Sequence, residues 1–454
     1  MKRFVWLGLV LFLFAICTGC GDVFRPVIIP NPPAFPDPRA SHSVMAVNDN
    51  GTDRGSLMVV NVSGDTDVGV TDMGLTPVHA VQSAANQVLV ANHATPGALG
   101  DSLTKISFLG TQILSTTTIS LPPDSAPNFV ATTQSGTAYV SLPGFAPPSV
   151  GVVSTTSNAL VATIPVGTGP VAMAETPDGK KLYVANQGDN SISSFNTIDR
   201  SARPIDLNGG PNPFSAPVWV SARSDNQRVY VLNGNDTLTT LDPTSAAGTT
   251  DKVLATLPNI GAGATYMVYD GHLNRLYIPS GSQLTVIDTA PSLPQILGTV
   301  PIDQVARGPA DPCSSTVDPT LPFRAVAVAA LPDGSRVYVG AFYGDTSGNI
   351  CPQVTVINTS SNTVKTAFPV PGSPRFWPYS PPICAATRFR LTMAAGGDNS
   401  RAYLASCDAG NVNIINTAND TYLLNLPAPA SSRAPIPPNN QPPPQNPVFL
   451  IAGP

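Results

Sequence analysis

Glutamate and lysine are almost missing from this chain of 454 residues: Glu175 is its single glutamate, and charged residues make up 11% of it. Both are strong helix formers, so their scarcity argues against a helical fold. Residues that favour turns, such as Asp, Gly, Pro, Ser, Thr and Asn, are abundant instead. With Val, Ile, Thr and Tyr between such turns, the composition predicts an all-β protein.

Positive charge is also scarce and is nowhere concentrated. The net charge is −5, and no cluster of Lys or Arg occurs along the sequence. Because phosphate recognition needs basic side chains gathered on one surface, we expect no nucleic acid partner. Hydrophobic residues make up 42% of the chain, which is enough to bury a sizeable core.

Common motifs of catalysis and metal binding are missing as well. No Gly-x-Ser-x-Gly segment and no phosphate-binding glycine loop occurs. The four histidines lie at unrelated positions, so we expect isolated loop or surface histidines. The four cysteines after Cys20 include no closely spaced pair of the kind that binds zinc. Asp-rich stretches at 49–53 and 65–67 could attract Ca²⁺, although neither has the spacing of an EF-hand. We expect no metal, no cofactor and no enzymatic activity.

The N-terminus has the features of a secretion signal. Two basic residues precede an apolar run over residues 4–16, which is too short to span a bilayer as a stable helix. Gly19 before Cys20 resembles the lipobox of bacterial lipoproteins, although Cys17 stands where that family usually has Leu. The resemblance implies cleavage before Cys20 and acylation of its sulfur, which anchors a chain to a membrane.

We therefore predict a lipoprotein signal peptide at 1–19, a proline-rich tether at 20–40 and a folded domain at 41–454. The anchored protein would lie at the cell envelope, on the outer membrane or on the periplasmic side of the inner membrane. Secretion without a lipid and an uncleaved anchor are the alternatives.

One short motif, a β run ending in a Tyr-Val-Ala-Asn-like tetrad, recurs through the domain. The first six copies lie about 44 to 50 residues apart, a period that fits a four-stranded propeller blade. A Pro-Asp-Gly turn precedes the clearest copies, and a strand of the type Ile-Asp-Thr follows them. The copies are at 45–48, 89–92, 139–142, 183–186, 230–233, 277–280, 338–341 and 403–406.

The stretch 170–197 resembles the YVTN-type β-propeller repeat, through Pro177-Asp178-Gly179 and the tetrad 183–186. The resemblance covers roughly residues 41 to 454 and implies a closed extracytoplasmic propeller, while few members have an assigned activity. Residues 41–75 supply only the second to fourth strands of a unit. We expect the missing first strand to be the C-terminal segment 447–453, reached by a Pro-rich connector at 427–447.

This arrangement predicts eight four-stranded blades in a ring closed by the C-terminal strand, with seven blades as the alternative. A disordered tail that leaves the last apolar residues unpaired is the competing interpretation of the C-terminus.

Four cysteines remain besides those near the N-terminus, and an oxidising compartment favours disulfides for them. Cys313 and Cys384 precede the last two complete units, whereas Cys351 and Cys407 follow the second strands of those units. In a propeller these two kinds of loop emerge on the same face. We predict the pairs Cys313–Cys351 and Cys384–Cys407, with the two other pairings open.

Aromatic side chains accompany these cysteines, namely Phe342 and Tyr343 in one unit and Phe376, Trp377 and Tyr379 in the next. Aromatics on a rigid loop suit recognition of a protein or a glycan, so they are candidate recognition residues. Packing within their own insert is the alternative.

The function expected from the sequence is a monomeric binding or scaffold protein at the envelope, with inserts at 301–323 and 371–389 as its recognition edge. A structural surface-layer component and a lactonase-like propeller enzyme are the alternatives. The enzyme would need His, Glu or Arg gathered on the central channel, and the shortage of Glu counts against it.

Overall fold

The chain divides into two units, Met1–Asp37 and Pro38–Pro454. The computed structural model describes only residues of the second unit: 43–49, 54–83, 86–94, 100–133, 136–244, 250–309, 311–374, 384, 388–429 and 445–453. The predicted signal peptide and tether, including Cys20, lie outside the described residues. Within the described part, no helix is long and apolar enough to cross a membrane.

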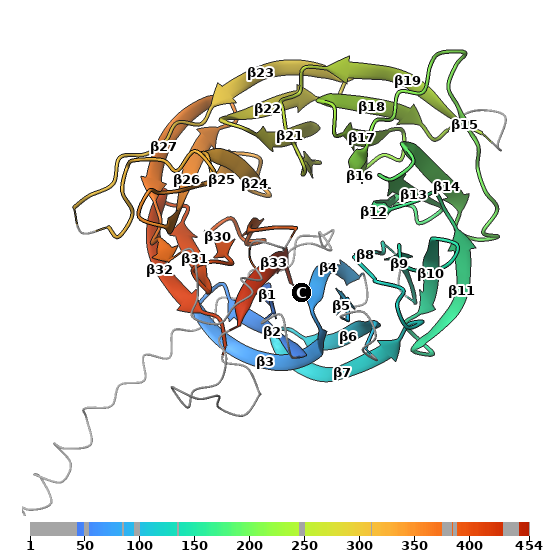
Figure 1. Cartoon of the computed structure of the whole chain (residues 1–454), viewed down its shortest axis with the longest axis horizontal. Helices are drawn as coiled ribbons and strands as arrows, with labels where there is room; N and C mark the ends of the chain where they lie inside the picture. The colour runs from blue at the N-terminus through green and yellow to red at the C-terminus, as the bar shows by residue number, and fades with distance from the viewer. Residues whose placement is uncertain are drawn as a thin grey trace, which may run out of the picture. The chain divides into compact units, whose positions relative to one another are not determined.

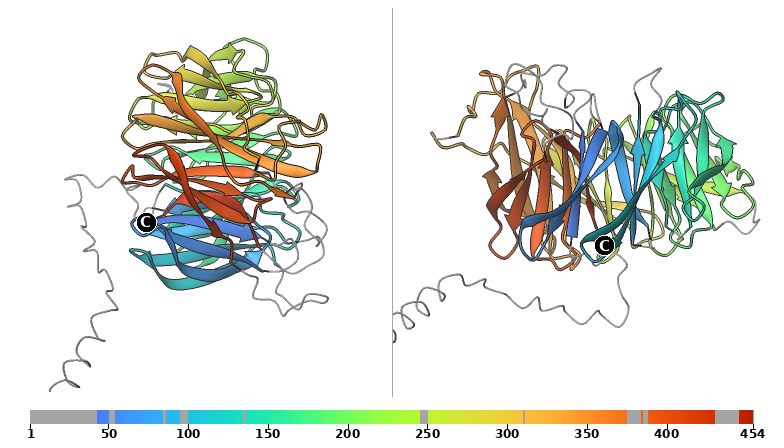
Figure 2. Two further views of the ribbon diagram at one scale, coloured as in Figure 1. Left: turned by 90° about the vertical axis from the view of Figure 1, so that its left-hand side faces the viewer. Right: turned by 90° about the horizontal axis from the view of Figure 1, so that it is seen from below.

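Eight β-sheets surround a common centre as the blades of a propeller (Figure 1). The strands run between the two faces of the ring, as the perpendicular views in Figure 2 show. Within a blade, strands that follow one another in sequence are antiparallel neighbours, with the first strand at the centre and the last at the rim. The predicted all-β, eight-bladed propeller is confirmed, and the seven-bladed alternative is wrong.

From the centre outward, blade 1 consists of β33 (Asn446–Ala452), β1 (Ser43–Asp49), β2 (Arg54–Asn61) and β3 (Thr66–Leu75), and blade 2 of β4 (Pro77–Ser83), β5 (Gln87–Asn92), β6 (Ser102–Leu109) and β7 (Gln112–Ser120). Blade 3 consists of β8 (Phe129–Ala131), β9 (Thr137–Leu142), β10 (Ser149–Ser154) and β11 (Ala159–Pro165), and blade 4 of β12 (Pro170–Glu175), β13 (Lys181–Asn186) and β14 (Ser191–Asn196).

Blade 5 consists of β16 (Pro217–Ala222), β17 (Val229–Asn233), β18 (Thr237–Asp242) and β19 (Asp251–Pro258), with β15 (Ile205–Asp206) outside β19, and blade 6 of β20 (Val268–Asp270), β21 (Arg275–Ser280), β22 (Gln283–Asp288) and β23 (Gln295–Pro301). Blade 7 consists of β24 (Arg324–Ala330), β25 (Arg336–Gly344), β26 (Asn349–Asn358) and β27 (Thr363–Pro369), with β28 (Ser373–Pro374) also paired to β26. Blade 8 consists of β29 (Leu391–Ala395), β30 (Arg401–Ser406), β31 (Asn411–Asn416) and β32 (Thr421–Pro427).

Burial explains why the repeats read as apolar runs. The second and third strands of blade 8 are buried along almost their whole length, because neighbouring blades cover both faces of the sheet. Its outer strand alternates between exposed and half-buried residues. The tyrosines that open several tetrads, Tyr183, Tyr230, Tyr277, Tyr338 and Tyr403, are among the largest fully buried side chains.

Blade 4 departs from the expected four strands. Its third strand is followed by a single bridge between Phe195 and Ala202, and β15 then pairs in parallel with β19 of blade 5. Arg203 donates to the buried Asp251 through Nε at 3.2 Å and Nη2 at 2.8 Å. This contact holds the segment against the next blade.

The ring closes as the sequence predicts. β33 pairs antiparallel with β1, and Met45 lies opposite Ile451 while Val47 lies opposite Phe449. The closing strand, coloured red, lies beside the blue N-terminal strand in Figure 1. The disordered-tail alternative is wrong for residues 446–452, whereas residues 430–444 of the connector lie outside the described part.

The two faces of the ring differ in what they carry. All first strands begin on one face, which we call the insert face because Cys313 and Cys384, one from each predicted insert, lie there. The N–H of Gly453, just after the closing strand, donates to the carbonyl of Ser43 at 2.9 Å. The first described residue, Ser43, therefore lies on the opposite face.

Candidate functional site

Two disulfides fasten the insert face. Cys313 is bonded to Cys351, and Cys384 to Cys407. The predicted pairing is confirmed, because in each case the loop that enters the blade meets the loop that follows its second strand. Cys384 of the second bond lies four residues before Arg388 in the sequence.

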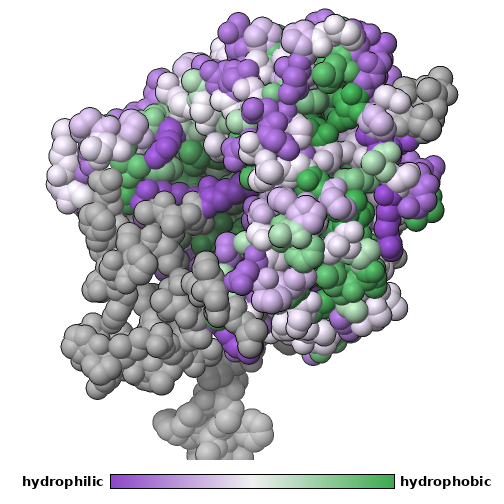
Figure 3. Space-filling model, turned by 45° about the vertical axis from the view of Figure 1, so that its right-hand side comes forward, coloured by the Kyte–Doolittle hydropathy of each residue, from purple (hydrophilic) through white to green (hydrophobic). Residues whose placement is uncertain are grey.

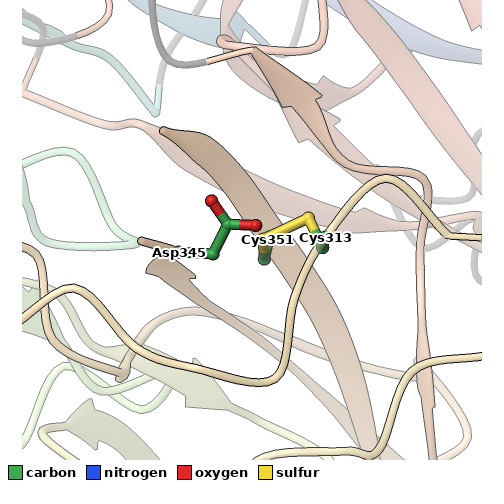
Figure 4. A group of neighbouring side chains, drawn as sticks. All are labelled: Cys313, Asp345 and Cys351. Atoms are coloured by element: carbon green, nitrogen blue, oxygen red, sulfur yellow. A yellow bond between two sulfur atoms is a disulfide. The ribbon is translucent and has the colours of Figure 1, made fainter. Parts of the chain in front are cut away.

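Asp345 organises the loop around the first disulfide (Figure 4). Its carboxylate accepts N–H bonds from Ser314 at 2.7 Å, Ser347 at 2.9 Å and Asn349 at 2.7 Å. These bonds and that of the Asn349 side chain lower the pKa of Asp345 against the opposing effect of burial. The sulfurs of Cys313 and Cys351 and a carboxylate oxygen of Asp345 lie within 4.8 Å of one another, close enough to share a metal ion. The two sulfurs are bonded to each other, however, so the three residues stabilise the loop rather than form a metal site.

The aromatic residues predicted for recognition do not form an exposed surface in the described part. Phe342 and Tyr343 are buried, with 2% and 0% of their surface exposed. The Tyr343 hydroxyl donates to the Ser314 carbonyl at 2.8 Å, so this ring packs its own insert. Burial removes both from the set of recognition residues, while Phe376, Trp377 and Tyr379 lie outside the described residues.

A layer of aromatic side chains fills the centre of the ring near the insert face. Phe129 stands at the start of β8, Trp219 near the start of β16, and Phe389 just before β29. Phe129 and Trp219 meet edge to face at 5.4 Å between ring centroids, and Trp219 meets Phe389 at 6.0 Å. Phe449 of the closing strand packs on Phe389 at 5.3 Å. Side chains from four blades thus form one floor.

Arg388 lies against this floor. Its guanidinium carbon is 5.8 Å from the Phe129 ring centroid, 5.3 Å from that of Trp219 and 5.1 Å from that of Phe389. It also donates hydrogen bonds to the carbonyls of Val171, in blade 4, and Val218, in blade 5. We call Arg388 with these three rings the central arginine site.

The electrostatics of this site are unusual. Enclosure by the surrounding groups lowers the pKa of Arg388 to about 10, so the guanidinium remains charged at neutral pH. The residue is nevertheless exposed to solvent. Figure 3 shows the ring hollowed near its centre, with hydrophobic residues at depth and hydrophilic ones around them. A cation therefore faces solvent from an apolar floor.

Two further arginines lie nearby on the insert face. Arg324 starts β24 and Arg390 precedes β29, and their guanidinium carbons lie 5.1 and 5.5 Å from the Phe342 ring centroid. Burial and the charge of Arg390 lower the pKa of Arg324. Arg390 is neutralised by Asp408, through bonds of 2.5 and 2.8 Å. Arg324, by contrast, has no polar partner among the described residues.

His79 is the one histidine of the described part in this layer, which corrects the expectation of isolated loop or surface histidines. It stacks on Phe129 at 3.7 Å, and its Nδ1 accepts the N–H of Val130 at 3.4 Å. Burial and the neighbouring Arg388 charge lower the pKa of His79 well below 6.5. The imidazole is therefore neutral at neutral pH and sealed inside the layer, which suits a structural role.

A separate pocket of about 480 Å³ lies on the same face at blades 1 to 3. Ser102, Thr118 and Ser120 line it with hydroxyl groups, and Asp101 supplies its one carboxylate. That carboxylate accepts bonds from the N–H groups of Ala94 and Ala126, both at 2.9 Å. The pocket is polar, but its acid already serves to hold the loops.

Sequence reasoning missed the central arginine site. Arg388 was included only in the range of an insert, because nothing in the local pattern distinguishes it from other arginines. The one available signal was its position just before a first strand, since first strands begin at the centre of the insert face.

Comparisons with known proteins support the fold. No family model and no curated protein matches the chain. The solved structure of dihydro-heme d1 dehydrogenase NirN in complex with DHE is similar with a TM-score of 0.58 and 12% identity, over 92% of this chain and 78% of that one. AztD from Citrobacter koseri is similar with a TM-score of 0.56 and 9% identity, over 91% and 99% of the two chains. At these identities the likeness concerns the propeller fold alone.

Proposed function

We propose that this chain is a lipid-anchored, non-enzymatic binding protein of the cell envelope, of the YVTN-type repeat kind, and that its insert face is the binding surface. The central arginine site on that face is the observation that carries the proposal. A cation held against an aromatic floor and open to solvent is an arrangement for recognition, because its charge and shape are fixed before a partner arrives.

The position of the N-terminal strand in the ring is consistent with a binding surface on the insert face. The chain enters the propeller at Ser43, on the face opposite the inserts. A segment that leads from an anchor at Cys20 would therefore join the propeller on the face opposite the inserts. The two disulfides favour a compartment outside the cytoplasm.

The chemistry of the site argues for binding over hydrolysis. His79 is buried in the aromatic layer and already accepts a backbone hydrogen bond. Asp408, the carboxylate bonded to Arg390, is held in a two-bond ion pair. A general base needs to reach its substrate, and neither group is free to do so.

The anchor is tested by labelling cells with radioactive palmitate. We expect Cys20→Ala to lose the label and Cys17→Ala to retain it. Label on the Cys20→Ala chain would show that the protein is held in some other way.

The binding face is tested by recovering partners from envelope extracts with charge-reversed variants. Arg324→Glu changes an exposed cation on the insert face, and Lys180→Glu makes the same change on the opposite face, where the Lys180 side chain is 66% exposed. We expect only Arg324→Glu to lower recovery. Equal partner recovery with both variants would show that Arg324 and the insert face around it are not the binding surface.

A further inference from the structure

Arg388 differs from most other arginines of the described part in its lack of an acidic partner. Seven arginines form ion pairs with aspartates within 4 Å, whereas Arg388 has no carboxylate partner among the described residues. The paired residues are Arg203–Asp251, Arg223–Asp225, Arg228–Asp242, Arg307–Asp311, Arg336–Asp420, Arg390–Asp408 and Arg401–Asp65. An added anion could therefore form a charge-assisted pair with Arg388 without displacing an acidic partner of the described part.

The guanidinium is also held in one orientation. Two of its N–H groups donate to Val171 and Val218, and three rings fix its plane from the sides. Its remaining N–H groups have no polar partner among the described residues. Because a guanidinium presents its donors as a planar fork, a group fixed in this way is prepared for a flat, two-oxygen acceptor.

We propose that Arg388 binds the carboxylate of a small anionic ligand at the centre of the insert face. This inference rests on the proposed binding function and names the chemistry of its ligand. The carboxylate is that of a free organic acid or of a peptide C-terminus, which share the same two-oxygen group. The aromatic layer beneath Arg388 is packed, so the ligand lies on the floor and does not enter it.

Arg324 strengthens the attraction from the same face. It adds a second cation with no acidic partner among the described residues, in a protein whose net charge is −5. Its contribution is long-range, because it stacks on Phe342 rather than on the central rings. We expect the removal of Arg324 to weaken binding less than the removal of Arg388 does. The effect of removing Arg324 should shrink further at high salt, which screens long-range attraction.

Trp219 provides the readout, because its ring centroid lies 5.3 Å from the Arg388 guanidinium carbon. The chain contains three tryptophans, and Trp6 belongs to the predicted signal peptide. The variant Trp377→Phe therefore leaves Trp219 as the single tryptophan of the mature protein. We would titrate it with sodium acetate, and with the tripeptide Gly-Gly-Ala carrying either a free or an amidated C-terminus, at constant ionic strength.

We expect saturable changes in Trp219 fluorescence with acetate and with the free peptide. Arg388→Gln should weaken the affinity by at least about tenfold, since it removes a charge-assisted pair. Arg200→Gln, which removes an exposed arginine at the turn after β14, should leave it unchanged. Tighter binding of the free peptide than of acetate would assign the site to C-termini, and the reverse would assign it to organic acids.

The absence of saturation with both acetate and the free peptide, or equal binding of the amidated peptide, would overturn the proposal. Because Arg388→Gln could disturb folding, Arg388→Lys serves as a second variant that keeps the charge without the planar fork. Binding as tight as that of the parent would show that the fork is not used. Equal partner recovery from envelope extracts with Arg324→Glu and Lys180→Glu, together with intact acetate binding, would refute the proposed function and leave this site in place.

Discussion

Arg401 in blade 8 and Asp65 in blade 1 are 336 residues apart in sequence, yet their side chains form two hydrogen bonds, from Nε at 2.8 Å and from Nη2 at 2.7 Å. Arg401 opens the second strand of its blade. Arg275 and Arg336 open the second strands of blades 6 and 7, and each likewise bonds to the following blade. The contact that joins successive blades is thus used once more to join the two ends of the ring.

Asp65→Asn should lower the free energy of unfolding by about 1–2 kcal/mol, because it removes the charge of a partly buried bidentate pair. Lys180→Gln is the matched control, since the Lys180–Asp178 pair is 3.8 Å long and mostly exposed. Urea unfolding of both variants measures the difference. Equal small losses would mean that Asp65 and Arg401 do not fasten the ring.

The closing strand carries a second, apolar test. Leu450 is 4% exposed and packs among the residues between blades 1 and 8, whereas Leu423 on the outer strand β32 is 41% exposed. Leu450→Ala should cost about 2–4 kcal/mol of unfolding free energy, and Leu423→Ala less than about 1 kcal/mol. Comparable losses would show that the last strand contributes little to the ring.

The repeat predicted most of the fold because each unit encodes its own strands and turns. Asn196 and Asp288 end third strands and accept N–H bonds from two residues ahead, at 2.9 Å in both cases. Thr289 donates to the carbonyl of Asn274 at 2.6 Å. Such contacts join residues close in sequence, so they can be predicted from the spacing of the repeat. The blade 4 departure depends on the pair Arg203–Asp251, which joins residues 48 apart.

The central site could not be predicted in the same way. His79, Phe129, Trp219 and Arg388 come from four different units, and each is an ordinary residue within its own repeat. They meet only because eight first strands converge on one centre. The disulfides were accessible to prediction, since the propeller topology alone brings their two loop types to one face.

The second disulfide should matter for the central site, and the first should not. Replacing Cys384 and Cys407 by Ser removes the bond four residues before Arg388, whereas replacing Cys313 and Cys351 frees a loop held by Asp345. Each double variant should lose about 2–4 kcal/mol of unfolding free energy. Only the variant without the Cys384–Cys407 bond should show a weaker Trp219 response to acetate.

Peptide mapping of the unreduced protein provides the control for that comparison. It should recover Cys313 linked to Cys351 and Cys384 linked to Cys407. Any crossed pair, or an acetate response that survives in the Cys384/Cys407 variant, would contradict this division of roles.

His79 should make the ring less stable in acid. Its pKa in the folded protein is lowered by burial and by Arg388, so the unfolded chain takes up a proton first as the pH falls below 6.5. Stability from this group is complete above pH 6.5, and below it is lost by up to about 1.4 kcal/mol per pH unit until the folded pKa is reached. His79→Phe keeps an aromatic ring in the stack and removes this term, so its stability should fall less steeply with acid.

Urea unfolding of the parent and of His79→Phe between pH 7.5 and 5 measures the effect. The variant loses the acceptor of the Val130 N–H, which adds an offset that does not vary with pH. His272→Gln, in the turn after β20, serves as the control, since it changes a histidine outside the aromatic layer. Parallel pH curves for the parent and His79→Phe would mean that the imidazole is not held neutral in the aromatic layer.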